Sequence, residues 1–318
     1  MKISELIYSH GRTCFSFEVL PPLKGRGITQ LFKNIDSLME FNPQYINITT
    51  HRSEFVYKST ADGLYQRISE RSRPGTVAVA AAIQQRYNIP AVPHLICSGF
   101  SRFDTEYSLI DLNFLGITNL LILRGDKAKH ESRFTPNENG YSHASDLIGQ
   151  VNKFNEGYLL DDTKMDIIKG NSFSYGVAGY PEKHDEAPNI DVDMEWLKNK
   201  VDKGADYIVT QMFFDNAKYF SFVEKCRSIG INVPIIPGLK PIVIRAQLTV
   251  LPKIFHVDLP NDLALELSKC NSDDAAKQIG VEWCTLQAKE LVSQGVPSIH
   301  FYSLMATESV RQVAQNTY

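Results

Sequence analysis

The chain has 318 residues, of which 43% are hydrophobic and 22% are charged, a composition typical of a globular protein with a large core. The formal net charge is −3 without a basic stripe, so we expect no nucleic-acid partner, and no run reaches the ~18 apolar residues of a membrane span. The five cysteines include no CxxC pair and the N-terminus has no signal-peptide core, so we expect a soluble, cytoplasmic protein with reduced thiols.

Short apolar runs alternate with segments of helical spacing in the first half of the chain. The first strand begins at Phe15 and must end at Pro21, because proline removes a ladder donor. The pattern then predicts a helix over 28–41, a strand over 45–50, a helix over 60–72, an apolar run of undecided type over 77–83, an irregular strand over 91–97, a helix over 104–115 and a strand over 119–126.

The second half opens with a polar loop over 127–141, a predicted helix over 142–155 and an irregular insertion over 156–171. There follow a strand over 173–180, a helix over 191–203, a strand over 207–214, a helix to 228, a strand over 233–238, a short helix over 246–252, two helices within 262–293 that break near 271–272, a strand over 297–304 and a helix over 307–315.

Eight strands separated by helices predict a parallel sheet, and eight such units in about 300 residues predict an α/β fold of the (β/α)8 TIM-barrel type. We expect one catalytic domain over 1–318. A doubly wound sheet is the alternative. It predicts a glycine-rich phosphate loop after an early strand, but neither GxGxxG nor GxxxxGK[ST] is present.

Polar residues stand at the carboxyl end of nearly every predicted strand, where the active sites of barrels lie. They are Glu18, Thr49, His94, Arg124 with Asp126, Tyr180 with His184, Gln211, Pro237 with Gly238, and Tyr302. Each alone has an ordinary structural explanation, Glu18 for instance as a solvent-facing glutamate. Together they predict an active site. The histidines are isolated and no nucleophile–base pair is present, so the set suits an organic cofactor better than a metal.

Seven ordered motifs carry a resemblance to a known family. They are Phe17-Glu18 with Pro21-Pro22, the run 93–97, the run Leu123-Arg124-Gly125-Asp126, the run 177–184, the run 210–215, the run 236–241, and His300-Phe301-Tyr302. In these motifs the chain resembles the 5,10-methylenetetrahydrofolate reductases over 15–302. The resemblance implies the catalytic barrel alone of a flavoprotein that makes 5-methyltetrahydrofolate, which supplies methyl groups for methionine synthesis.

The resemblance also implies a site with non-covalent FAD and without a metal. The cofactor-binding residues that it implies are Thr49, His94, Leu123, Arg124, Gly125, Asp126, His143, Ala144, Asp146, Ala178, Tyr180, His184, Asp193 and Lys200. The substrate-binding residues that it implies are Glu18, Gln211, Gln247, Leu251 and Tyr302. Many members have a tyrosine at the position of His143, and some have an aromatic residue at that of Leu251.

The catalytic residues implied by the resemblance are Glu18 and Asp126. NADH or NADPH would give a hydride to flavin N5 and leave, and methylenetetrahydrofolate would then occupy the same face. Glu18 would protonate the folate N5, and Asp126 would lie between flavin and pterin. Many members carry an arginine after the last strand where this chain has Met305-Ala306-Thr307, so Lys240 or Arg245 would have to replace it.

Several alternatives stay open at this point. The sequence does not choose between NADH and NADPH, because the site has no Rossmann fold with a readable ribose-binding acid. We expect small-molecule substrates and a homo-oligomer. A flavin-free, folate-binding methyltransferase barrel and a non-catalytic binding barrel are the rival interpretations.

Overall fold

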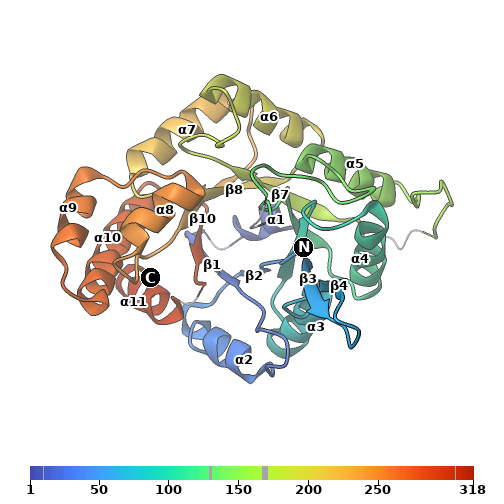
Figure 1. The fold of residues 1–318 in the computed structure, drawn as a ribbon. Coiled ribbons are helices and arrows are strands. Elements are labelled where there is room, and N and C mark those ends of the chain that lie inside the picture. Colours follow the sequence, from blue (N-terminus) through green and yellow to red (C-terminus); the bar gives the residue numbers. More distant parts are fainter. Residues whose placement is uncertain (10, 129–130, 167–170, 305) are drawn as a thin grey trace. The chain divides into compact units, whose positions relative to one another are not determined.

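The structure is a computed structural model that describes residues 1–9, 11–128, 131–166, 171–304 and 306–318. Parallel strands close into an eight-stranded barrel in the order β1-β10-β9-β8-β7-β6-β5-β2 (Figure 1). Helices separate successive barrel strands along the chain in most of the connections. The predicted (β/α)8 fold is therefore confirmed.

The strands of the barrel are β1 (Cys14–Val19), β2 (Tyr45–Ile48), β5 (Ala91–Ile96), β6 (Asn119–Leu123), β7 (Ser174–Gly179), β8 (Tyr207–Met212), β9 (Ile235–Leu239) and β10 (Ser298–Tyr302). A separate two-stranded sheet consists of β3 (Glu54–Ser59) and β4 (Tyr65–Glu70).

The helices are α1 (Ile3–Leu6), α2 (Thr29–Asp36), the 3-10 turn η1 (Met39–Phe41), α3 (Thr76–Tyr87), α4 (Arg102–Phe114), α5 (Ala144–Asn155), α6 (Ile190–Asp202), α7 (Asn216–Ser228), α8 (Gln247–Phe255), α9 (Asn261–Lys269), α10 (Asp273–Ser293) and α11 (Thr307–Thr317). Among the helices of the described ranges, none is long and apolar enough to cross a membrane.

The chain divides into two compact units. The first unit consists of Met1–Val19, Phe32–Asn47 and Ser174–Tyr318, and the second of Leu20–Leu31 and Ile48–Phe173. The expectation of one domain over 1–318 stays a prediction.

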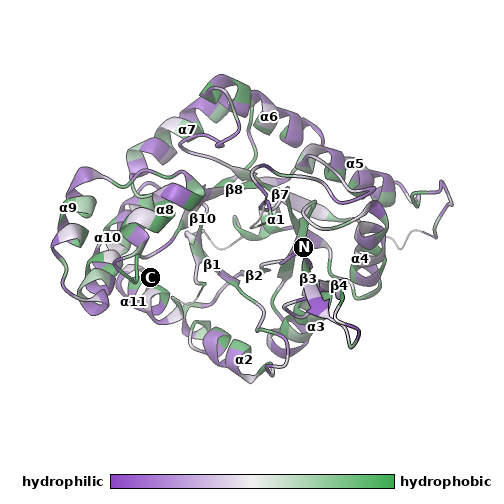
Figure 2. Ribbon diagram, in the orientation of Figure 1, coloured by the Kyte–Doolittle hydropathy of each residue, from purple (hydrophilic) through white to green (hydrophobic). Residues whose placement is uncertain are grey.

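In the first unit, strand β1 is buried along its whole length. The Phe15 ring lies within 5.8 Å of the rings of Phe17, Phe41, Phe301 and Tyr318, measured between centroids. Strands of a parallel barrel are covered on both faces, so the alternation of the sequence does not expose Ser16 or Glu18 to solvent. Figure 2 shows strand β8 of the same unit mostly in green, whereas helices α6 and α7 alternate between hydrophobic and hydrophilic residues.

The C-terminal part of the first unit confirms the predicted break between two helices. The Ser272 hydroxyl accepts a hydrogen bond from Ala275 N at 3.2 Å and thereby begins α10. Helices α9 and α11 both pack against α10, as Figure 1 shows in orange and red. Gly280, in the middle of α10, lets this helix approach the chain segment that follows β9.

In the second unit, the prediction of a helix over 60–72 is wrong, because this region contains the turn and the second strand of the β3–β4 hairpin. The turn residue Gly63 has φ +77°, and Thr60 N donates to Leu64 O at 2.8 Å to close the turn. The Asp62-Gly63 pair is a hairpin signal. Arg67 also lies 3.6 Å from the ring centroid of Phe55 across the hairpin, a contact that helical spacing cannot produce.

The other elements of the second unit agree with the predictions made from the sequence. The undecided run 77–83 lies inside α3. Pro93 precedes the residues of β5 that pair with β6, which begin at His94, so the proline does not interrupt the ladder between β5 and β6. In the predicted insertion, Leu160 N donates to Glu106 Oε2 at 2.5 Å and ties the loop to α4. Residues 167–170 of the insertion and 129–130 of the polar loop lie outside the described residues.

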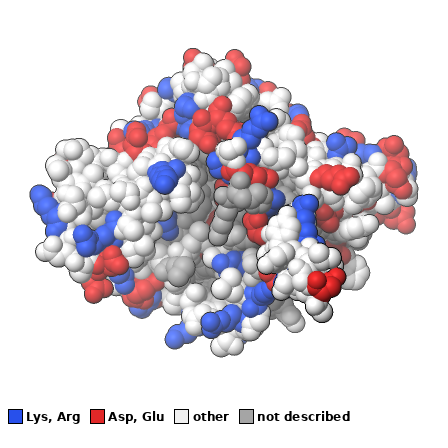
Figure 3. All heavy atoms as spheres, viewed as in Figure 1, with Lys and Arg blue, Asp and Glu red and all other residues white. Residues whose placement is uncertain are grey.

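Charged side chains of both signs are interspersed over the face drawn in Figure 3. This distribution agrees with the small formal net charge of −3. Among the described residues on this face, no large patch of one sign is present that would attract a polyanion.

Candidate active site

In the first unit, Glu18 is a buried acid at the carboxyl end of β1. Its exposed fraction is 4%, and it pairs in register with Tyr302 of β10. The Ser303 hydroxyl donates to Glu18 O at 2.5 Å, which holds the end of the strand. The solvent-facing interpretation of Glu18 is therefore wrong, because the strand is covered on both faces. A carboxyl group in such surroundings costs free energy to ionise without a charged partner.

His300 lies beside Glu18, and the sequence interpretation missed it. The His300 Nε2 and Glu18 Oε2 atoms are 3.9 Å apart, with side chains 0% and 5% exposed. The His300 ring packs edge-on against the Tyr302 ring, with centroids 5.1 Å apart. The signal was the two-residue spacing of His300 and Tyr302, which places both side chains on the same face of a strand.

Tyr302 pairs with Glu18 across β1 and β10 and is fixed by a hydrogen bond and by close packing. Its hydroxyl donates to Thr210 O at 2.7 Å, and Gly238 N donates to Thr210 Oγ1 at 2.9 Å. A Cβ on Gly238 would lie 2.6 Å from the Tyr302 ring, so only glycine fits there. Burial, and then the charge of Glu18, raise the pKa of Tyr302 well above its ordinary value, so the phenol stays neutral.

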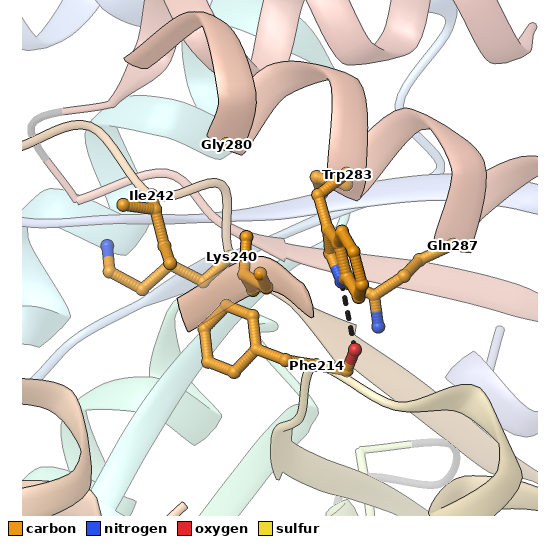
Figure 4. Close-up of a pocket in the computed structure, with 8 residues that line it drawn as sticks. Phe214, Lys240, Ile242, Gly280, Trp283 and Gln287 are labelled. Atoms are coloured by element: carbon orange, nitrogen blue, oxygen red, sulfur yellow. Dashed lines mark hydrogen bonds between the residues drawn. The ribbon is translucent and has the colours of Figure 1, made fainter. Parts of the chain in front are cut away.

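Lys240 follows β9 and brings a cation to the same region. Its exposed fraction is 8%, and burial lowers its pKa while the charge of Glu18 opposes this shift. Figure 4 shows Lys240 beside Phe214 and Ile242, in a small space that α10 closes from the other side. The Trp283 indole donates to Phe214 O at 2.9 Å across this space. Lys240 is therefore a buried cation whose charge favours the carboxylate form of Glu18.

The amides predicted to bind substrate lie on two other elements of the first unit. Gln211 is half-buried near the end of β8, where the register with β9 shifts, and its Oε1 accepts a hydrogen bond from Met212 N at 2.9 Å. Gln247 begins α8, and its Oε1 accepts from Val243 N at 2.7 Å. Leu251 is 2% exposed and packs in the core of this region.

A second group of predicted residues surrounds the start of α6. His184 N donates to Asp193 Oδ2 at 2.9 Å, and the rings of Tyr180 and His184 meet edge-on with centroids 4.7 Å apart. Lys200 Nζ donates to Ala178 O at 2.8 Å. Burial lowers the pKa of Lys200 to about 8, although the charge of Asp193 opposes this shift. The structure therefore brings together all five residues that were predicted here.

In the second unit, the run that follows β6 forms a tight turn. Gly125 has φ +80°, and a Cβ there would lie 2.9 Å from Ser98 Cβ. Ser98 N donates to Arg124 O at 2.9 Å, and its hydroxyl donates to Asp126 O at 2.6 Å. The Arg124 guanidinium lies 4.7 Å from the ring centroid of Phe134, and the Asp126 side chain is exposed. Leu123, directly before this turn, is the last residue of β6.

His94 and Thr49 lie on the neighbouring strand ends of the second unit. His94 is 6% exposed on β5, and its carbonyl accepts a hydrogen bond from Thr50 Oγ1 at 2.5 Å. Thr49 follows β2 directly and is half-buried. Arg52, which the sequence interpretation did not name, donates from Nη1 to Ser98 Oγ at 3.3 Å. No motif pointed to Arg52; only its place just after a strand end does.

The N-terminus of α5 contributes the last predicted residues. His143 is the N-cap with φ −134° and is exposed, Ala144 is the first helical residue, and Asp146 lies in the first turn. Unpaired backbone N–H groups at such a terminus favour anions. In the described ranges no group of three His, Cys, Asp or Glu side chains is arranged to hold a metal ion. Many members carry an arginine after the last strand, where this chain has Met305-Ala306-Thr307. Met305 lies outside the described residues.

Comparison with known proteins finds similarity to methylenetetrahydrofolate reductases. The family model described as methylenetetrahydrofolate reductase matches residues 2–317. Methylenetetrahydrofolate reductase (NADH) 1 of Arabidopsis thaliana is 32% identical over 331 residues, which cover 99% of this chain and 50% of that protein. The 5,10-methylenetetrahydrofolate reductase of Salmonella typhimurium is 30% identical over 299 residues, covering 94% of this chain and 88% of that protein.

Among solved structures, the chain is similar to an uncharacterised protein from Clostridium thermocellum that binds two copies of 5-methyl-5,6,7,8-tetrahydrofolic acid. The TM-score is 0.55 at 13% identity, with 99% of this chain and 98% of that chain covered, so this likeness concerns the fold alone. The chain spans about half the length of the plant relatives that it matches. Because the family model covers nearly every residue, the chain belongs to the methylenetetrahydrofolate reductase family.

Proposed function

We propose that the chain binds FAD non-covalently and reduces 5,10-methylenetetrahydrofolate to 5-methyltetrahydrofolate with NADH or NADPH, supplying methyl groups for methionine synthesis. The observation that carries the proposal is Glu18, an acid that is 4% exposed at the end of a barrel strand in a chain of this family. Active sites of barrels lie at these strand ends.

Glu18 is proposed as the general acid. Opening the five-membered ring of the substrate requires a proton on its N5, and a carboxyl group can deliver that proton if it stays protonated near neutral pH. Burial favours the neutral form of a carboxyl group, whereas the nearby Lys240 favours the ionised form. After proton transfer the charge of Lys240 would stabilise the carboxylate that remains.

The second unit offers groups that suit a flavin and its phosphates. Gly125 is half-buried with positive φ, and a Cβ there would press on Ser98, so this tight turn requires glycine. Arg124 and the α5 terminus with His143, Ala144 and Asp146 provide a cation and backbone donors of the kind that bind phosphate. Bound FAD would supply the hydride that it takes from NADH or NADPH. Thr49, His94 and Leu123 would complete this surface.

The first unit offers groups that suit the adenosine and diphosphate portion. Lys200 is a half-buried cation held by Ala178 O, and the Tyr180 and His184 rings present flat surfaces beside it. The burial that lowers the pKa of Lys200 to about 8 would be offset by an anionic phosphate. Asp193 positions the His184 backbone in this group.

The substrate side would be provided by the amides and by two further side chains. Gln211 and Gln247 each accept a backbone hydrogen bond at Oε1, and their amide N–H groups would donate to pterin. Tyr302 and Leu251 would bound the space, and Asp126 would face the pterin as an exposed carboxylate. Lys240, already beside Glu18, or Arg245 would replace the substrate arginine of other members.

A visible spectrum followed by two half-reactions tests the proposal. The purified protein should be yellow, should bleach with NADH or NADPH under anaerobic conditions, and should regain its colour with methylenetetrahydrofolate. The preferred nucleotide is the one that bleaches faster at equal concentration. A colourless protein that still binds folate would support the flavin-free methyltransferase instead. A colourless protein without folate affinity would support the interpretation as a non-catalytic binding barrel.

We also propose a cytoplasmic location and a homo-oligomeric state. The five cysteines are all free and buried, as expected for reduced thiols. Light scattering on the eluting protein would measure the number of subunits, and a monomer at all concentrations would contradict the second proposal.

A further inference from the structure

A chain of side chains leads away from Glu18 into the barrel interior of the first unit. Ser16 and Glu18 lie two residues apart on β1, and His300 and Tyr302 lie two apart on β10. The parallel register pairs Ser16 with His300 and Glu18 with Tyr302. Side chains two residues apart share one face of a strand, so Ser16, His300 and Glu18 follow one another in space.

The contacts of Ser16 bear on the tautomer of His300. The Ser16 hydroxyl donates to Ile299 O at 3.2 Å, and a carbonyl can only accept. When the hydroxyl hydrogen is on Ile299 O, Ser16 Oγ accepts from His300 Nδ1, which lies 3.2 Å away; a hydroxyl that donates to Nδ1 instead would place the ring hydrogen on Nε2. The Asn47 amide nitrogen is farther from Nδ1, at 3.5 Å. The first of these arrangements places the hydrogen of His300 on Nδ1 and leaves Nε2 as an acceptor, and it is the tautomer on which the inference below rests.

That acceptor points at the acid. His300 Nε2 is buried and forms no hydrogen bond among the described residues, and Glu18 Oε2 lies 3.9 Å from it. This separation exceeds hydrogen-bond length, so the two groups must approach one another before a hydrogen bond forms between them. A bare Nε2 at this place accepts a hydrogen bond from the acid form of Glu18 and offers none to its carboxylate form.

We propose that His300 is a positioning residue that holds the acid proton of Glu18 and keeps this carboxyl ready to protonate the substrate. The inference rests on the proposed function. In the step itself the O–H bond of Glu18 breaks, an N–H bond forms at the substrate, and the electron pair stays on the carboxylate. His300 remains neutral throughout. Other groups that interact with Glu18 include Lys240, which favours the carboxylate, and Tyr302, which is neutral.

Two substitutions of His300 separate this role from packing. His300→Asn retains a donor near Nδ1 and removes the acceptor beside Glu18, whereas His300→Gln extends an amide to the position of Nε2. Both substitutions replace the buried imidazole ring by a smaller amide, so the loss of packing is similar in the two variants. The reoxidation of reduced enzyme by methylenetetrahydrofolate should slow about tenfold or more in His300→Asn, a part of the 10²- to 10⁴-fold that a general acid contributes. His300→Gln should stay within about threefold of wild type.

The pH profile and the reduction by NADH or NADPH complete the test. In His300→Asn the loss of folate activity on the alkaline side should begin at lower pH, because Lys240 then acts on Glu18 without the opposing acceptor. Reduction by the nucleotide should be unchanged in both variants. An unchanged pH profile, or an equal loss in both half-reactions, would overturn the assignment to His300.

A measurement on the protein without turnover checks the tautomer itself. In the ¹⁵N spectrum of labelled wild type, the signals lost in His300→Asn should be those of a neutral ring protonated on Nδ1. A ring protonated on Nε2 would overturn the inference. If wild type reduces methylenetetrahydrofolate but His300→Asn behaves normally, only this inference fails. If wild type does not reduce it at all, the proposed function fails first.

Discussion

Replacing Gly280 by alanine should destabilise the protein, although alanine is the better helix former. Gly280 lies inside α10, where the exchange alone would contribute roughly 1 kcal/mol of stability. Its added Cβ would stand 2.0 Å from Ile242 O and 2.7 Å from Ile242 N and C. Backbone atoms cannot swing aside as a flexible side chain can, so α10 or the segment after β9 must move by about 1 Å to reach an ordinary contact.

The expected magnitude follows from the two opposing effects. Overpacking of this kind costs about 3 kcal/mol, and the helix propensity of alanine returns about 1 kcal/mol. A net loss of about 2 kcal/mol lowers the melting temperature of a chain of this length by about 3 °C. Gly149→Ala is the matched control, because Gly149 lies inside α5 with nothing within 4 Å of its Cβ, and it should raise the melting temperature slightly.

The segment after β9 also carries Lys240, so a shift of this segment in Gly280→Ala should slow reoxidation by methylenetetrahydrofolate more than reduction by the nucleotide. Thermal unfolding followed by circular dichroism, with the flavin saturated, measures the first effect, and stopped-flow absorbance measures the second. A Gly280→Ala protein as stable as Gly149→Ala would refute the reasoning from the backbone contact.

Three further predictions concern the site. Glu18→Gln should abolish reoxidation by methylenetetrahydrofolate and largely spare bleaching by NADH or NADPH, because the amide cannot donate a proton to N5; equal loss of both half-reactions in stopped flow would contradict this role. FAD affinity, measured by fluorescence titration, should be constant below pH 8 and weaken above it, because the free Lys200 loses its charge near its pKa of about 8. Lys200→Met should remove this pH dependence, whereas Lys198→Met, on the outer face of the same helix, should keep it. Gly125→Ala should weaken FAD binding at least tenfold. A residue with a Cβ at φ +80° costs about 1 kcal/mol, and the Cβ would also press on Ser98, so the turn should change shape. Unchanged FAD affinity would show that this turn does not approach the flavin.

The periodicity of the sequence was sufficient for the architecture. Apolar runs of strand length, ended by proline or charge, alternate with helical spacing, and these local signals do not depend on distant contacts. The break between α9 and α10 was likewise local, because Ser272 caps the new helix through its own neighbour Ala275. The hairpin of β3 and β4 was missed because its exposed strands carry no buried face, so neither period stood out and only Asp62-Gly63 marked the turn.

The polar strand ends and the family motifs indicated Glu18 from the sequence alone, but not its state. Alternation in β1 suggested one solvent-facing side, whereas closure of the barrel covers both and leaves Glu18 4% exposed. Its surroundings are also nonlocal: His300 and Lys240 follow Glu18 by more than 200 residues and reach it only because β1 pairs with β10, and β10 with β9. The sequence alone thus identified Glu18 as a candidate acid, whereas its burial and its partners depended on which strands became neighbours in the barrel.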